Sequence, residues 1–303
     1  MKKLKNPRLM LIVSMTIFGT LGIFVRNIPV SSGELALYRA ILAALLIAIY
    51  LIITKQRISF TKIKKEVPLL LLSGIAMGIN WILLFEAYKY TTVSLATLSY
   101  YFAPVIVTVV CPVLFHERLT GKQILCFIMS TIGLVMITGI GDIGSGSDFI
   151  GILFGLGAAV FYATVILLNK FIKNVEGIPR TFLQFLSAIV ILIPYVMLSG
   201  GMSLGGMNAV GWINLLIVGL VQTGVTSCMY FSSLKELPGQ KAAILSYIDP
   251  LVAVLISVTI LGEKMTIWQI AGGVLILGFT LWNEVSPNTK IMGGRNVFSG
   301  SDC

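Results

Sequence analysis

Three long apolar runs near the start of the chain constrain its fold more than any other feature. They cover Leu9–Val25, Leu35–Ile53 and Val67–Phe85, and Arg39 is the only charged residue within them. The hydrocarbon core of a bilayer is about 30 Å thick, and a helix of roughly 20 apolar residues crosses it. Each run therefore predicts a transmembrane helix. We expect the first to be retained as a span rather than cleaved as a signal peptide, because it is too long for one.

The composition of the whole chain agrees with these runs. Of its 303 residues, 57% are hydrophobic and 11% are charged, whereas soluble domains carry about 25% charged residues. In lipid, backbone polar groups must be paired within the protein, which leaves only helices or closed barrels. The sequence lacks the alternating strands of about ten residues that are typical of barrels. We therefore predict an all-α integral membrane protein.

Charge clusters and Gly or Pro residues divide the apolar sequence into ten predicted transmembrane spans. The residues after the last span, 285–303, are polar and Gly-rich, and we expect them to form a disordered cytoplasmic tail. The ten spans are 9–27, 34–54, 67–88, 92–115, 121–140, 149–171, 179–199, 209–232, 240–261 and 265–284.

The distribution of Lys and Arg predicts the orientation of these spans, because cytoplasmic loops carry an excess of both. With the N-terminus placed in the cytoplasm, all but four of the 22 Lys and Arg residues fall in cytoplasmic segments. Arg26, Lys89 and Lys264 fall outside, and Arg39 lies within the second span. We predict a multi-pass protein of the cytoplasmic membrane with both termini in the cytoplasm. The net charge of +10 reflects this bias and does not indicate a nucleic-acid partner.

One passage of the sequence occurs twice. A shift of 146 residues places Pro104 on Pro250 and Glu117 on Glu263 in an alignment without gaps. Shared hydrophobicity does not easily place a Pro and a Glu at one fixed offset, so we infer an internal repeat. We expect the two prolines to interrupt the fourth and ninth spans near mid-depth. We expect the two glutamates to bond the N-terminal amides of the helix that follows each of them.

The two copies are predicted to cross the membrane in opposite directions. Each copy, 9–140 and 149–284, holds five spans, and because five is odd the second copy enters the membrane from the other side. The predicted fold is thus ten transmembrane helices arranged as two inverted five-helix repeats. This is the architecture of many secondary transporters, in which the halves rock about a site near the midplane.

The repeated passages also carry recognisable motifs. The first copy reads "FEAYKYTTVSLATLSYYFAPV" and later "FHERLTGKQI", and the second reads "FSSLKELPGQKAAILSYIDPLVAVL" and "LGEKMTIWQI". In these motifs the chain resembles the EamA-type repeat of the drug/metabolite transporter superfamily, and the resemblance covers 9–284. It implies a transporter of small organic solutes, often amino acids or other metabolites and often moved outward. It does not select one substrate.

Polar and aromatic side chains within the spans are the candidates for a solute-binding cavity. Each one alone is expected more often to form a hydrogen bond between helices, but a set drawn from six helices could line a wet central cavity. Tyr100 and Tyr230 belong to the same set. The candidate substrate-binding or coupling residues are Asp249, Arg39, Asn80, Trp81, Tyr101, Tyr162, Gln184, Gln222 and Tyr247.

The two ionisable members of this set each allow a structural and a functional interpretation. Arg39 could form an ion pair with Glu86 or extend to the headgroups, or it could contact the solute. Asp249 aligns with Ala103, so the symmetry of the repeats does not require it. Low dielectric disfavours the charged form of an unpaired carboxylate. Asp249 could therefore carry a proton or accept a substrate ammonium, or it could be a neutral acid bonded to a neighbouring helix.

These features predict a secondary transporter of a small polar metabolite. The resemblance implies an exporter of solutes such as amino acids. The partners are the solute, membrane lipid and a proton as coupling ion. An enzyme is not expected, because His116 is the only histidine and no carboxylate pair lies within the spans. We expect no cofactor and no metal, and no nucleotide-binding motif occurs. The alternative is a non-transporting membrane scaffold or receptor subunit.

Overall fold

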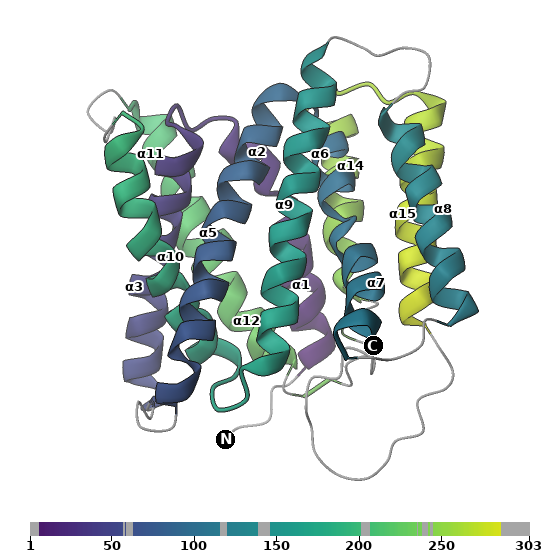
Figure 1. Ribbon diagram of the computed structural model, residues 1–303. Helices are drawn as coiled ribbons and strands as arrows, with labels where there is room; N and C mark the ends of the chain where they lie inside the picture. The colour runs from purple at the N-terminus through teal and green to yellow at the C-terminus, as the bar shows by residue number, and fades with distance from the viewer. Residues whose placement is uncertain are drawn as a thin grey trace.

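The protein is all-helical wherever its structure is described. The computed structural model describes residues 6–56, 58, 63–115, 120–138, 146–200, 207–234, 236–237, 242 and 245–285. No strand occurs within these residues (Figure 1). The helices are α1 (Pro7–Gly19), α2 (Leu21–Val25), α3 (Ser32–Ile53), η1 (Lys64–Glu66), α5 (Val67–Tyr90), α6 (Val93–Tyr100), α7 (Ala103–Phe115), α8 (Gly121–Thr138), α9 (Gly146–Phe171), α10 (Gly177–Leu198), α11 (Ala209–Leu216), η3 (Ile217–Val225), α12 (Thr226–Leu234), α14 (Ile248–Thr259) and α15 (Ile267–Glu284).

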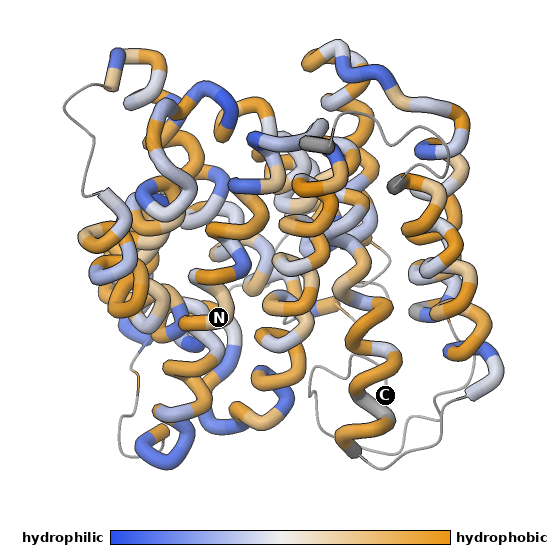
Figure 2. Tube along the Cα trace, turned by 45° about the horizontal axis from the view of Figure 1, so that its top comes forward, coloured by the Kyte–Doolittle hydropathy of each residue, from blue (hydrophilic) through white to orange (hydrophobic). Residues whose placement is uncertain are grey.

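Most of these helices have the length and composition of membrane spans. In the described residues, seven helical segments are long and apolar enough to cross a membrane. Three shorter apolar helices, Gly121–Ile137, Ile248–Thr259 and Ile267–Asn283, lie within the fifth, ninth and tenth predicted spans. Hydrophobic residues cover the lengths of the helices, and hydrophilic residues gather near their ends (Figure 2). The chain is a multi-pass helical membrane protein, and the count of ten spans stays a prediction.

Several predicted spans are interrupted. The fourth consists of α6 and α7, which are separated at Tyr101 and Phe102, and Pro104 lies in the first turn of α7. Proline is tolerated there because an N–H in the first turn has no intrahelical acceptor. The interruption predicted at Pro104 is thus confirmed. Pro250 lies in the first turn of α14, directly after a turn at Tyr247.

The eighth predicted span contains a π-helical stretch, η3, between α11 and α12. The hydroxyls of Thr223 and Thr226 each donate to a carbonyl five residues earlier, on Val218 and Val221, at 2.8 Å. Short π-helical segments within α-helices occur frequently at functional sites. The stretch therefore makes this part of the bundle a candidate for a functional site.

Glycines bring several helices into close contact. A Cβ on Gly74 of α5 would lie 2.5 Å from the carbonyl oxygen of Gln184 in α10, and one on Gly155 of α9 would lie 2.9 Å from the Ser99 Cβ. Small residues allow helix backbones to approach in this way within membranes. Among the helix pairs in contact are α5 with α9, α3 with α10, and α8 with α15, which run side by side in Figure 1.

Loops that are predicted to share a membrane face lie together. Arg26, Thr91, Asp148 and Glu263 join at one end of the bundle through hydrogen bonds and an ion pair. At another loop cluster, predicted to be cytoplasmic, the carboxylate of Glu66 accepts hydrogen bonds from the backbone of 173–174. These groupings agree with the predicted alternation of the spans. Which end faces the cytoplasm stays a prediction.

Candidate functional site

Asp249 lies in the first turn of α14, and its neighbour is a tyrosine of the first half of the chain. The Tyr101 hydroxyl donates a hydrogen bond of 2.5 Å to the Asp249 Oδ2. Tyr101 can point there because α6 ends at Tyr100, just before the interruption. Among the described residues, no cation forms an ion pair with Asp249. In the described structure, the one side-chain donor to this carboxylate is the Tyr101 phenol.

Further tyrosines surround this carboxylate. The Tyr100 ring lies 5.8 Å from that of Tyr101 and 5.2 Å from that of Tyr162 in α9, between ring centroids. We call Asp249 and these three tyrosines the tyrosine–aspartate cluster. Asp249 also interacts electrostatically with two more tyrosines, Tyr88 in α5 and Tyr230 in α12. Tyrosines of four helical spans thus converge on one carboxylate.

Tyr162 is exposed on the interior side of α9. Its side chain is 38% exposed, while Leu153 and Val160, on the outward face of the same helix, are 51% and 50% exposed. Successive residues of an α-helix are about 100° apart, so Tyr162 lies about 200° from Val160. Its neighbours Ala159 and Ala163 are buried. The exposed surface of Tyr162 therefore faces an opening among the helices and not the lipid-facing side.

Arg39 lies in a second cluster, in the middle of the helices and away from carboxylates. It is 6% exposed, and its Nε donates a hydrogen bond of 2.6 Å to the Thr223 Oγ1 in η3. Its guanidinium lies over the rings of Trp81 and Phe85, at 4.7 and 5.6 Å from the ring centroids. We call Arg39, Thr223, Trp81 and Phe85 the arginine cluster.

Both structural interpretations of Arg39 are corrected by these contacts. Glu86 pairs with Lys89 at 3.1 Å, and it forms no ion pair with Arg39 in the described structure. The side chain is also buried and does not extend to the headgroups. A guanidinium stacks readily on aromatic faces, which explains why Arg39 points inward to Trp81.

The two clusters are connected by aromatic residues. Tyr88 and Tyr100 each interact electrostatically with both Arg39 and Asp249. A positive and a negative group thus both act on the same two tyrosines. This arrangement can distinguish solutes by charge.

Three predicted amides form hydrogen bonds between helices. The Asn80 Nδ2 donates to the Ala158 carbonyl at 2.7 Å, so this side chain joins α5 to α9. Gln184 Nε2 donates to the Ser73 Oγ at 2.6 Å. Both amides are buried, and their donors bond to protein acceptors, so their role is to join helices.

Gln222 is the third amide, and Trp81 and Tyr247 are the remaining candidate residues. Gln222 in η3 donates to the Thr20 Oγ1 at 2.7 Å, at the junction of α1 and α2. The Trp81 ring meets that of Phe185 edge to face, with centroids 5.3 Å apart. Tyr247 is half-buried and directly precedes α14. The structure therefore brings Asp249, Tyr101 and Tyr162 together and places Arg39 and Trp81 in the arginine cluster. The other four candidates, Asn80, Gln184, Gln222 and Tyr247, belong to neither cluster.

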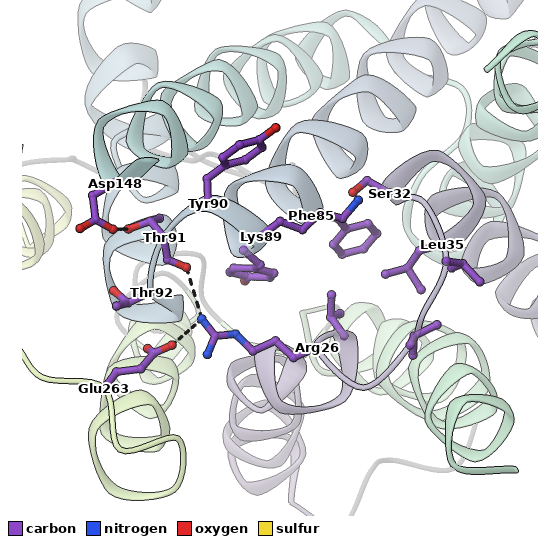
Figure 3. Close-up of a pocket in the computed structure, with 14 residues that line it drawn as sticks. Arg26, Ser32, Leu35, Phe85, Lys89, Tyr90, Thr91, Thr92, Asp148 and Glu263 are labelled. Atoms are coloured by element: carbon purple, nitrogen blue, oxygen red, sulfur yellow. Dashed lines mark hydrogen bonds and ion pairs between the residues drawn. The ribbon is translucent and has the colours of Figure 1, made fainter. Parts of the chain in front are cut away.

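A pocket of about 690 Å³ opens at the end of the bundle that is predicted to face outside (Figure 3). Its polar wall is the ion pair between the Arg26 Nη2 and the Glu263 Oε1, at 2.5 Å. Phe85 and Tyr88 also line it, so the pocket reaches side chains that contact or couple to Arg39. This pocket was not predicted, although Arg26 and Glu263 are charged residues on the same predicted face.

The predicted role of Glu263 needs one correction. Its Oε2 accepts a hydrogen bond of 2.9 Å from the backbone N–H of Val93, the first residue of α6. It thus bonds the N-terminus of a helix in the other half of the chain and not that of α15. The N-terminus of α15 is capped by Thr266 and Gln269 instead. Glu117, the matching residue, lies outside the described residues.

Comparison with known proteins gives matches over nearly the whole chain. A model of the EamA-like transporter family matches residues 7–139 and 149–283. The chain is 30% identical over 268 residues to the uncharacterized transporter YxxF of Bacillus subtilis (strain 168), covering 88% of this chain and 85% of that protein. It is 28% identical over 281 residues to an uncharacterized transporter of Archaeoglobus fulgidus, covering 90% and 95%.

A solved structure shares the fold. One crystal structure superposes with a TM-score of 0.62, covering 90% of this chain and 95% of its own, at 15% sequence identity. At this identity the likeness concerns the arrangement of the helices alone.

Proposed function

The chain belongs to the EamA-like transporter family, and on this premise we propose that it is a secondary transporter that exports small polar metabolites such as amino acids. Transport proceeds by alternating access about a central site in the cytoplasmic membrane. The site lies between two inverted five-helix repeats, 9–140 and 149–284, and a proton is the coupling ion.

The pairing of helices supports two related halves. The family model matches the chain twice, and the contacts come in matched sets. At the shift of 146 residues, α5 on α9 corresponds to α12 on α1, α7 on α9 corresponds to α14 on α1, and α3 on η3 corresponds to α10 on α5. Such matched contacts are expected of two copies related by a pseudo-twofold axis.

One observation carries the proposal. The two charged groups of the central clusters both bond across the two matched segments, Arg39 to Thr223 and Asp249 to Tyr101. In transporters built from inverted repeats, the solute site lies at the repeat interface near the midplane. If one half rocks against the other, these bonds break or shift, so the charged groups would become accessible to each side in turn.

Asp249 is the group that we assign to proton coupling. The titratable groups that interact with it are Tyr88, Tyr100, Tyr101, Tyr162 and Tyr230, and phenols ordinarily titrate near pH 10. Arg8 is the only charged residue of α1, and no charged residue lies in α2 or α6. Asp249 is therefore the group of this cluster expected to change charge between acidic and neutral pH.

Flux into proteoliposomes under an imposed pH gradient tests the proposal. The wild-type protein should move at least one labelled amino acid or related metabolite, at a rate that follows the gradient. Asp249→Asn should remain folded and lose the pH dependence. Glu176→Gln is the matched control, because Glu176 is exposed and makes no capping bond.

Two results would count against the proposal. An Asp249→Asn variant with an unchanged rate and pH profile would remove the coupling role of this residue. A folded wild-type protein that moves no solute of the panel would favour the non-transporting scaffold or receptor subunit.

A further inference from the structure

The tyrosine–aspartate cluster presents negative charge from several directions. The Asp249 carboxylate supplies a full charge, and its one hydrogen-bond donor in the described structure is the Tyr101 hydroxyl. The faces of aromatic rings are negative and attract cations. Tyr100 and Tyr162 lie with their rings 5.2 Å apart and tilted by 31°, and both interact electrostatically with Asp249.

Space for a ligand is indicated by Tyr162. This side chain is 38% exposed although it lies on the interior side of α9. Asp249, Tyr100 and Tyr101 are also partly exposed. Asp249 lies about 200° around α14 from Leu251, at about 100° per residue, and Leu251 is 52% exposed on the outer side. Asp249 therefore lies on the inner side of α14, as Tyr162 does on α9.

From this geometry we propose that the tyrosine–aspartate cluster is a subsite for an organic ammonium group on the transported solute. The inference rests on the proposed transport function, whose solute it narrows to amine-bearing compounds. The carboxylate neutralises the ammonium, and Tyr100 and Tyr162 contact its methylene or methyl groups through their ring faces. Aromatic residues around a cation form the usual recognition site for alkylated ammonium groups.

A metal ion fits this cluster less well. Hard cations such as Ca²⁺ take six to eight oxygen ligands, commonly several carboxylates. The described residues contain no group of three or more His, Cys, Asp or Glu side chains placed to hold a metal. The arginine cluster does not compete for the ammonium, because Arg39 already places a cation over its rings.

Binding of a matched pair of probes tests the subsite. Choline carries a quaternary ammonium, and 3,3-dimethylbutan-1-ol is its uncharged isostere. With the purified full-length protein at pH 8, calorimetric titration should give choline binding at least tenfold tighter than that of the alcohol. Ethanolamine and tetramethylammonium extend the set to a primary ammonium and to the headgroup alone.

Variants assign the binding to the cluster. Asp249→Asn should weaken binding of the ammonium probes at least tenfold, and Tyr162→Leu should weaken the binding of choline severalfold. Tyr195→Leu and Glu176→Gln should leave it unchanged, because Tyr195 is 45% exposed and Glu176 lies in a loop. Thermal unfolding of each variant verifies that it is folded.

The outcomes separate this inference from the proposed function. If the protein transports a solute but no ammonium probe binds, or the isostere binds equally well, the subsite is wrong and the transport function stands. If Asp249→Asn is folded and keeps the wild-type affinity, the subsite is likewise wrong. If ammonium probes bind in an Asp249-dependent way but no solute is transported, the proposed function fails and the subsite stands.

Discussion

At the scale of single residues, each of the two central charges bonds to a neutral side chain of the other half of the chain, Arg39 to the Thr223 hydroxyl and Asp249 to the Tyr101 hydroxyl. Arg39 and Asp249 were conspicuous because ionisable groups are rare within membrane spans. Their partners, Thr223 and Tyr101, lie 184 and 148 positions away along the chain. No local pattern predicts such contacts. The nearer pairing with Glu86 was wrong because Arg39 points inward to aromatic rings.

Arg39 allows a prediction about the balance of stability and function. A buried charge without a carboxylate partner costs stability. Loss of Arg39 leaves Thr223 satisfied, since its hydroxyl also donates to the Val218 carbonyl at 2.8 Å. We therefore expect Arg39→Met to unfold at the wild-type temperature or above, while transport falls at least tenfold. Thermal unfolding and flux are measured on the same preparation.

Either of two results would contradict this account of Arg39. A strongly lowered unfolding temperature would make the residue structural. Wild-type flux in a stable Arg39→Met protein would remove it from the solute path.

At the scale of helices, hydropathy predicted where elements occur better than how they are interrupted. The break beside Pro104 was predictable because proline cannot continue a hydrogen-bonded helix. The π-helical stretch at Ile217–Val225 was not, because a one-residue shift in hydrogen bonding leaves the apolar composition unchanged. Likewise, α14 is shorter than the span predicted at 240–261 because a turn at Tyr247 precedes it.

Two glycines of α15 should respond oppositely to substitution by alanine. A Cβ on Gly272 would press on the carbonyl oxygen of Gly133 in α8, and backbone atoms cannot yield. Overpacking of this kind costs about 1–3 kcal/mol. At Gly278, in the same helix, no atom lies within 4 Å of a new Cβ. Because alanine has the higher helix propensity, the substitution there should stabilise the protein by up to about 1 kcal/mol.

Thermal unfolding of both variants in one detergent checks this prediction. Gly272→Ala should unfold at a lower temperature than the wild type, and Gly278→Ala at the same or a higher one. Equal unfolding temperatures for the two variants would show that α8 and α15 do not pack through this glycine contact.

At the scale of the whole molecule, the repeated positions and the differing positions have separate roles. The repeated residues, such as Pro104 and Pro250, shape equivalent helices in the two halves. The central charges occur where the halves differ, since Asp249 aligns with Ala103 and Arg39 with Phe185. The repeat could therefore be read from the sequence, whereas the site arises from contacts between non-equivalent residues of the two halves.

Solute counterflow is the measurement that tests the central claim of alternating access most directly. Proteoliposomes are loaded with an unlabelled solute that the protein transports and are diluted into a trace of the same solute with a label, without an ion gradient. We predict a transient accumulation of label inside above the outside concentration, abolished by Arg39→Met and retained in Glu176→Gln. Label that only equilibrates, or a wild-type protein that takes up none, would contradict a carrier that exposes its site to each side in turn.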